Sequence, residues 1–138
     1  MRELSHQART ITVVVIAVLF VCIGWVKFAF WQSNRISPQF QEASESAYHM
    51  IQECDSNIAQ EESSFPICVK KTKDALALLK KIATTQGERL KYAVLNGYLD
   101  AVRDCRRDWE LSDLSTEAKE RQEQLVRFRR DLANRGFH

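Results

Sequence analysis

The residues best suited to chemistry in this chain are its cysteines, and two of them flank a polar stretch in ECDSNIAQEESSFPICVK. Cys54 and Cys68 are expected at the facing ends of two antiparallel helices, at similar heights. A zinc site needs about four ligands, and His49 and His138 do not converge on this pair. Redox centres usually hold their thiols closer together, as in a C-x-x-C motif. The spacing therefore predicts a disulfide, which would stabilise a small domain by about 3 kcal/mol.

The other two cysteines receive different interpretations. Cys105 is expected at the same end of the folded part as Cys54 and Cys68, so it could replace either partner. If it stays unpaired, it is either a buried apolar filler, which is the favoured alternative, or a thiol that joins two subunits of a homodimer. Cys22 lies in the apolar N-terminal segment and is expected to be an inert packing residue.

Few other residues form a pattern typical of catalysis or metal binding. Glu45, His49 and Glu53 share a helix face at i, i+4 and i+8, but a single histidine without a motif such as H-E-x-x-H favours a solvated face over a metal site. The chain contains no G-x-S-x-G motif and no glycine-rich phosphate loop. We therefore predict no catalytic residue, no metal and no cofactor. An enzyme would have to rely on His49 or Cys105.

Two charged segments are candidate binding surfaces. In DAVRDCRRDWE, the pairs Asp100/Arg103 and Asp104/Arg107 are neighbours on a helix. An ion-paired outer face is the favoured interpretation of this strip, and a surface that binds a protein partner is the functional alternative. The last predicted helix carries four arginines that are candidates for contact with anionic head groups at the membrane surface: Arg127, Arg129, Arg130 and Arg135.

The N-terminal part of the chain has the composition of a membrane-spanning helix. Residues 11–31 are apolar at all but two positions, and at about 1.5 Å per residue they reach roughly 30 Å, the thickness of a bilayer's hydrocarbon core. Trp25 and Trp31 lie toward one end, as membrane-interface residues do, and Lys27 can extend past them. We predict a transmembrane signal anchor over residues 11–33 that contacts the lipid bilayer through residues 11–31.

Two alternatives to a retained anchor fit the N-terminal segment less well. A cleaved secretory signal would share the basic start, with Arg2 and Arg9, but no A-x-A-like cleavage site follows the apolar core and the apolar run is too long. A lipoprotein signal would use Cys22, but Val21 precedes it at a position where a small residue is needed. The retained anchor is the favoured interpretation.

The distribution of Lys and Arg predicts which side of the membrane each part occupies. Two arginines precede the apolar segment, whereas Arg35 is followed by no Lys or Arg until Lys70. The six acidic side chains in this gap have no compensating base, which is typical of a translocated segment next to a membrane. We predict that residues 1–10 are cytoplasmic and that residues 34–138 lie in the periplasm of a bacterial inner membrane, or its equivalent.

The overall charge gives little indication of a nucleic-acid partner. The net charge is +2, and residues 70–138 hold sixteen Lys and Arg against eleven Asp and Glu. Such an excess is modest for a nucleic-acid binder, and a domain outside the cytoplasm would rarely meet one. We therefore expect no nucleic acid among the partners.

The remainder of the chain is predicted to be helical, because glycine and proline are few and apolar residues recur at steps of three and four. The fold class is all-α, with one N-terminal transmembrane helix followed by an up-down antiparallel bundle. Four bundle helices are favoured, and three with a long second helix are the alternative. The expected capping residues are Ser37, Ser63 or Ser64, Thr85 with Glu88 in a capping box, and Ser115.

The apolar periodicity also predicts which face of the third bundle helix is buried. The expected inner face comprises Leu90, Val94, Tyr98, Ala101 or Val102, Cys105 and Trp109. Gly136, close to the end of the chain, suits a C-terminal helix cap.

These observations predict a non-catalytic, membrane-anchored binding protein. The favoured role is an accessory or assembly subunit of a larger envelope membrane complex, held by a protein partner. One alternative is a membrane-tethered periplasmic inhibitor or immunity protein that neutralises an effector through the Asp100 to Arg107 strip. A helical-bundle sensor with an internal ligand pocket is another alternative, although such sensors usually have a membrane helix on each side of the bundle.

Overall fold

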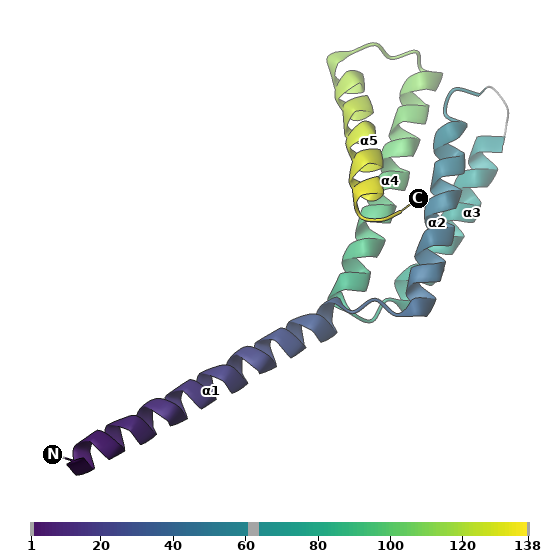
Figure 1. Ribbon diagram of the computed structural model, residues 1–138. Coiled ribbons are helices and arrows are strands. Elements are labelled where there is room, and N and C mark those ends of the chain that lie inside the picture. The colour runs from purple at the N-terminus through teal and green to yellow at the C-terminus, as the bar shows by residue number, and fades with distance from the viewer. Residues whose placement is uncertain (1, 61–63, 138) are drawn as a thin grey trace. The chain divides into compact units, whose positions relative to one another are not determined.

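The computed structural model describes residues 2–60 and 64–137, and every regular element in these residues is an α-helix (Figure 1). The all-α prediction is therefore confirmed for the described residues. Ser63 lies outside them, and Ser64 is already part of a helix. The helices are α1 (Arg2–Asn34), α2 (Pro38–Ser56), α3 (Ser64–Ile82), α4 (Gln86–Glu110) and α5 (Thr116–Asn134).

The chain divides into two compact units, one ending at Arg35 and the other beginning at Ile36. The first unit is α1, whose large apolar side chains from Ile11 to Trp31 are exposed on all sides of the helix. A helix that is apolar all round is normally buried in a large core or in lipid. By length and composition, the segment Ser5–Asn34 is able to cross a membrane.

The second unit is a helical bundle in which α4 is the central element. α2 lies beside α3 and α4 lies beside α5, while α4 also packs against both α2 and α3 (Figure 1). Among the described helices, the backbone of α5 comes close to α4 alone. The bundle therefore consists of two helical hairpins joined through α4.

Serine side chains begin two of these helices, as the sequence predicts. The Ser37 hydroxyl accepts a hydrogen bond from the backbone N–H of Phe40 (3.2 Å) at the start of α2. The Ser115 hydroxyl accepts one from the backbone N–H of Ala118 (3.2 Å) at the start of α5. Each bond satisfies a backbone donor that has no partner within its own helix.

A capping box separates α3 from α4. α3 ends at Ile82, and Thr85 precedes the first residue of α4. The Thr85 hydroxyl accepts from the backbone N–H of Glu88 (3.1 Å), and the Glu88 carboxylate accepts from the backbone N–H of Thr85 (3.2 Å). The break that the sequence predicts near residue 85 is confirmed.

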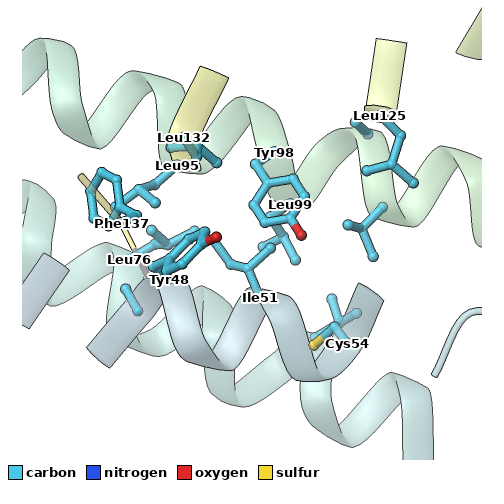
Figure 2. Close-up of a cluster of buried hydrophobic side chains, with 14 of the residues drawn as sticks. Tyr48, Ile51, Cys54, Leu76, Leu95, Tyr98, Leu99, Leu125, Leu132 and Phe137 are labelled. Atoms are coloured by element: carbon cyan, nitrogen blue, oxygen red, sulfur yellow. The ribbon is translucent and has the colours of Figure 1, made fainter. Parts of the chain in front are cut away.

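The core of the bundle is formed by apolar side chains from all of its helices (Figure 2). Ile51 from α2, Leu76 from α3 and Leu99 from α4 are among the most deeply buried side chains. α5 contributes Leu125 and Leu132 to the same cluster. Burial of each such side chain is worth about 1.5 to 3 kcal/mol, so this shared core is the main source of stability.

The predicted inner face of α4 is wrong at both ends. Leu90 is 56% exposed and Trp109 is 38% exposed, whereas Leu95 and Leu99 are buried. The reason is that α4 packs against α2 and α3 on one side and α5 on the other. Its buried surface is therefore wider than a single stripe and is centred on the middle of the helix, around Leu99.

The chain turns back into the core after α5. Gly136 has a positive φ of 91°, a conformation that glycine adopts without a steric penalty. The backbone N–H of Phe137 donates to the carbonyl of Leu132 (3.1 Å), which closes the helix end as a Schellman motif does. The turn places the ring of Phe137 in the core, with its centroid 4.9 Å from that of Tyr48 (Figure 2).

Candidate functional site

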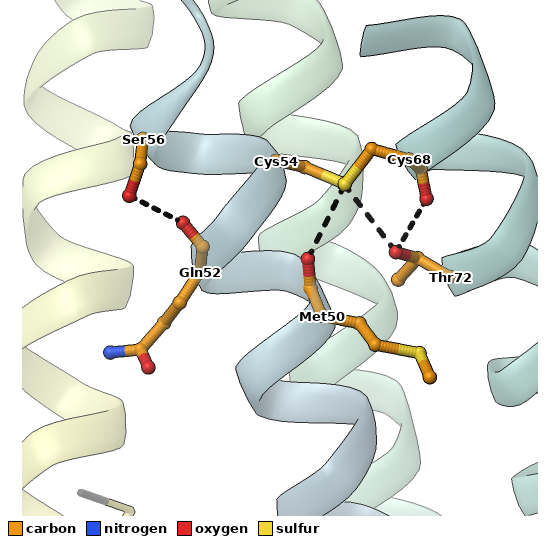
Figure 3. Close-up of a disulfide and its surroundings, with 6 residues drawn as sticks. All are labelled: Met50, Gln52, Cys54, Ser56, Cys68 and Thr72. Carbon is orange, nitrogen blue, oxygen red and sulfur yellow. Dashed lines mark hydrogen bonds between the residues drawn. A yellow bond between two sulfur atoms is a disulfide. The ribbon is translucent and has the colours of Figure 1, made fainter. Parts of the chain in front are cut away.

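The predicted cysteine pair joins α2 to α3. Cys54 and Cys68 are paired as a disulfide, with their Cα atoms 5.7 Å apart (Figure 3). The Thr72 hydroxyl lies 3.5 Å from the Cys54 sulfur and donates to the carbonyl of Cys68 (2.8 Å). The pair therefore lies in a packed environment at the end of the hairpin opposite Ser37, as antiparallel helices require.

Cys105 is not paired, and it is buried between α4 and α5. Its thiol lies 3.6 Å from the backbone carbonyl of Arg121, to which it donates. Burial, followed by the charge of Asp108, raises the pKa of Cys105 and so favours the unreactive thiol form. Within this chain, Cys105 is thus a free thiol packed between the two helices. Cys22 is an exposed free cysteine on α1.

Arg106 of α4 is a buried cation that the sequence analysis did not single out. Its guanidinium donates to three backbone carbonyls of the chain that follows α2, those of Asn57 (3.1 Å), Ile58 (2.7 Å) and Gln60 (2.5 Å). It also pairs with Glu110 (2.9 Å). Hydrogen bonds from a charged donor are stronger than those between neutral groups, so Arg106 holds the turn after α2 in place from the neighbouring hairpin.

A second polar contact joins α2 to α4 and α5. Asp55 at the end of α2 accepts a hydrogen bond from the Tyr98 hydroxyl (2.5 Å) and a bidentate pair from Arg129, whose Nε lies 2.7 Å from the carboxylate. Burial, then the hydrogen bond to Asp55, raises the pKa of Tyr98 far above its usual range. The phenol therefore remains a donor, and all three side chains are held in one arrangement.

Glu88 forms a corresponding polar cluster at the other end of the bundle. Its carboxylate accepts hydrogen bonds from Thr84 and Thr85, and from the Ser37 hydroxyl (3.1 Å) at the start of α2. Burial alone would raise the pKa of Glu88, but these hydrogen bonds outweigh it and lower the pKa below its usual value. The carboxylate thus ties the N-terminal ends of α2 and α4 together.

The predicted Asp/Arg strip of α4 lies on the surface. Arg103 is 4.0 Å from Asp100 and Arg107 is 3.7 Å from Asp104, and all four side chains are about half exposed or more. Both contacts are long for ion pairs, so they hold the side chains loosely. The strip therefore stays accessible to a partner.

Asp108 continues the acidic row of α4 but is buried. It accepts two hydrogen bonds from Arg121 of α5 (2.7 and 2.9 Å). Arg121 also lies 3.6 Å from Asp113 in the loop between the two helices. Asp108 is therefore a structural link within the α4/α5 hairpin rather than a member of the exposed strip.

The four arginines predicted to contact head groups do not behave alike. Arg129 is paired with the largely buried carboxylate of Asp55 although its own side chain is half exposed, whereas Arg127, Arg130 and Arg135 are exposed on α5 and the turn that follows. Within the described residues, Arg127, Arg130 and Arg135 have no ion pair and are available for an external contact. On α1, the predicted interface anchors Trp25, Lys27 and Trp31 are all exposed.

Two surface grooves lie near the end of the bundle that carries the disulfide. One, of about 310 Å³, runs between α2 and α3 and is bordered by Glu53, Ile67 and Lys71. The other, of about 430 Å³, lies between α2, α4 and α5, next to Cys105 and Trp109. In the described residues, no three His, Cys, Asp or Glu side chains converge as a metal site would require.

The structure thus defines a class in coarse terms: an all-helical protein with one helix able to cross a membrane and a helical bundle that contains a cysteine pair. Comparison of the chain with protein-family models, curated proteins and solved structures gives no match. The function must therefore be argued from the surfaces of the chain itself.

Proposed function

We propose that the chain is a single-pass membrane protein that presents its bundle to the periplasm, or an equivalent oxidising compartment, and binds a protein partner. In this proposal α1 is the anchor, residues 1–10 are cytoplasmic and α2 to α5 form an up-down antiparallel four-helix bundle. The favoured role is that of an accessory or assembly subunit of a larger envelope membrane complex, without catalysis.

The observation that carries this proposal is the cysteine pair in a unit that follows a membrane-length apolar helix. Disulfides persist in oxidising compartments and are rare in the cytosol. Cys54 and Cys68 lie at bonding distance, and the chain between Arg35 and Lys70 has no Lys or Arg. Both features support the export of α2 and α3 across a membrane.

A thiol count on the full chain in its native membrane tests the location. Free thiols are blocked before lysis, the protein is reduced, and newly exposed thiols are labelled and mapped by mass spectrometry. We expect labels on Cys54 and Cys68 alone, on a chain that still carries α1. Four blocked thiols would instead place the bundle in a reducing compartment, and loss of α1 would identify a cleaved signal.

Co-purification tests the role. The full chain, cross-linked in unstressed cells, is expected to bring down other membrane proteins in a fixed ratio. The control is a chain in which α1 is replaced by an unrelated membrane-spanning helix, which retains the anchor but not the side chains of α1. A wild-type chain that purifies without a stoichiometric partner would contradict the subunit role.

The exposed Asp/Arg strip supports a second candidate role, that of a tethered inhibitor. Asp100, Arg103, Asp104 and Arg107 are loosely paired at the surface, so a partner could replace their contacts at little cost. An inhibitor of this kind would be free in unstressed cells, and its deletion would be harmful only when the effector is present. Charge reversal of Asp100 and Asp104 would then abolish protection.

A further inference from the structure

The outer surface of the α2/α3 hairpin, on the side away from α4, has two halves of opposite charge. We call it the α2/α3 face. α2 contains four acidic residues and no Lys or Arg, whereas α3 contains five lysines and a single aspartate, Asp74. An acidic helix and a basic helix thus run side by side along one hairpin (Figure 1).

The charges on this face are not paired with each other. Glu42 and Glu53 on α2 and Lys71 and Lys81 on α3 are exposed, and none of them has an ion pair or hydrogen bond within the described residues. Asp108 of α4, by contrast, is paired with Arg121 of α5. The α2/α3 face therefore keeps two rows of charge available to another molecule.

The two rows are in register with each other. The cysteine pair fixes the level at which α2 and α3 meet, and Glu53 and Lys71 border the same groove beside it. Glu42 lies twelve residues before Cys54, and Lys81 lies thirteen residues after Cys68. At about 1.5 Å per residue, both are roughly 18 to 20 Å from the disulfide. Each glutamate is therefore level with a lysine of the other helix.

Apolar side chains complete the basic half of the face. Ile67, Lys71, Leu78 and Lys81 recur at helical spacing along one strip of α3, with Asp74 between them. Ile67 is 59% exposed and Leu78 is 64% exposed. Ile67 also lies at the level of the 310 Å³ groove between the helices. Exposed apolar groups beside unpaired charges are typical of a protein contact rather than of a purely solvated surface.

Symmetry determines which partner fits such a face. If two copies meet face to face around a twofold axis parallel to the helices, α2 of each copy lies over α3 of the other, and acidic rows meet basic rows. A twofold axis across the helices would place α2 over α2 and bring like charges together. The face is thus complementary to itself in only the first arrangement.

The connection to the anchor is compatible with this arrangement. Only three residues separate the end of α1 from the start of α2, so the anchor joins the bundle at the end that carries Ser37. An axis parallel to the helices places the Ser37 ends of both copies at one end of the dimer, so both anchors can enter the same membrane.

We propose that the α2/α3 face binds a second copy of this chain, with Glu53 opposite Lys71 and Glu42 opposite Lys81 of the other copy. This inference rests on the proposed membrane anchoring and deepens it by naming one partner. The contact does not involve Cys105, so the dimer is noncovalent. Each of the two glutamate–lysine contacts occurs twice because of the symmetry.

The size of the face fits a reversible dimer. Two 19-residue helices are about 28 Å long and, packed about 10 Å apart, cover roughly 550 Å² on each copy. The total of roughly 1,100 Å² is at the lower limit for a specific interface. Confinement of both copies to one membrane would raise their effective concentration and so favour the dimer.

Charge reversal on the full chain in detergent micelles tests the proposal. Glu42→Lys/Glu53→Lys places lysines against lysines in a homodimer, and Lys71→Glu/Lys81→Glu places glutamates against glutamates. We expect each variant alone to dissociate at least about tenfold more readily than wild type in light-scattering or native mass measurements. An equimolar mixture of the two variants restores every contact, so we expect heterodimers of near wild-type affinity.

The matched control is Glu120→Lys/Glu123→Lys, which makes the same charge change at exposed positions on α5. It is expected to dimerise like wild type, and helix content by circular dichroism verifies that every variant is folded. A monomeric wild-type chain, unaffected dimers in the face variants, or variants whose mixture does not recover would each overturn the proposal. A dimer that forms while the thiol count places the bundle in a reducing compartment would contradict the proposed location alone.

Discussion

The two hairpins of the bundle are held together by different means. The α2/α3 hairpin is joined by the Cys54–Cys68 pair, and the exposed side chains of Glu42, Glu53, Lys71 and Lys81 have no ion pair within the described residues. The α4/α5 hairpin is joined by apolar side chains of the core and by an ion pair between Asp108 and Arg121. The Asp108 carboxylate of this pair is buried. A covalent link holds two helices together without using charged side chains, so those of α2 and α3 remain available for binding.

The hairpins also differ in what they supply to each other. Arg106 of α4 donates to the turn that follows α2, and Tyr98 of α4 donates to Asp55 at the end of α2. The α4/α5 hairpin therefore provides polar contacts that support the α2/α3 hairpin. α4 is thus the structural centre of the bundle, whereas α2 and α3 provide an exposed charged face.

The largest expected effect comes from removal of the covalent link. Reduction of the Cys54–Cys68 pair, or its replacement by Cys54→Ala/Cys68→Ala, is expected to lower the free energy of unfolding by about 3 kcal/mol, because the bond closes a loop of 14 residues in the unfolded chain. Urea unfolding with and without reductant measures it. The Cys22→Ser variant, which keeps the pair, serves as the control.

That experiment also tests the difference between the hairpins. If charges alone held α2 to α3, reduction would change the unfolding midpoint very little, and raised salt would destabilise the protein strongly. We expect the opposite, a large effect of reductant and a small effect of salt, because Glu42, Glu53, Lys71 and Lys81 have no ion pair within the described residues. A reductant effect below about 0.5 kcal/mol would contradict the stabilising role of the pair.

The local features of this bundle were predictable from sequence. Ser37 followed by Pro38, and Thr85 followed three residues later by Glu88, are capping signals that operate within one turn of chain. The cysteine pair was predictable too, because its members flank one loop between two antiparallel helices. In each case the two interacting groups are close in sequence, so no knowledge of the tertiary fold is needed.

The polar contacts between hairpins were not predictable in the same way. Arg106 stands in the run CRRDW, where a surface position is the natural interpretation, and its acceptors lie 46 to 49 residues earlier in the chain. Similarly, periodicity gave the direction of the buried stripe of α4 but not its width, which depends on how many helices pack against it. Leu90 and Trp109 were therefore misplaced.

The next largest effect is expected at Arg106. Arg106→Ala removes the donor to three carbonyls of the turn after α2 and should lower the free energy of unfolding by about 2 kcal/mol, since several hydrogen bonds from one charged donor are lost together. The matched control is Arg107→Ala, the adjacent arginine, whose side chain is exposed. We expect that control to change stability by less than about 0.5 kcal/mol.

Hydrogen exchange locates the effect of this substitution. The backbone amides at the end of α2 should lose protection in Arg106→Ala, while those of α5 should not. Equal losses of amide protection in Arg106→Ala and Arg107→Ala would show that the Arg106 guanidinium does not stabilise the end of α2. That result would contradict the proposed role of α4 in supporting the α2/α3 hairpin.

The smallest expected effect concerns the hydroxyl of Tyr98. Tyr98→Phe removes one donor to Asp55 but leaves the bidentate contact with Arg129, so we expect a loss of only about 1 to 2 kcal/mol. Tyr92→Phe, which removes a hydroxyl from the same helix, is the control.

The contribution of the Tyr98 hydroxyl should also depend on pH. Because the pKa of Tyr98 is raised in the folded chain, the hydroxyl's contribution to stability is complete below the unfolded pKa of about 10 and declines as the pH rises above it. Urea unfolding between pH 8 and 11 should therefore show a steeper decline in wild type than in Tyr98→Phe. Parallel declines would mean that ionisation of Tyr98 does not affect stability, which would contradict the effect of burial and of the hydrogen bond to Asp55 on its pKa.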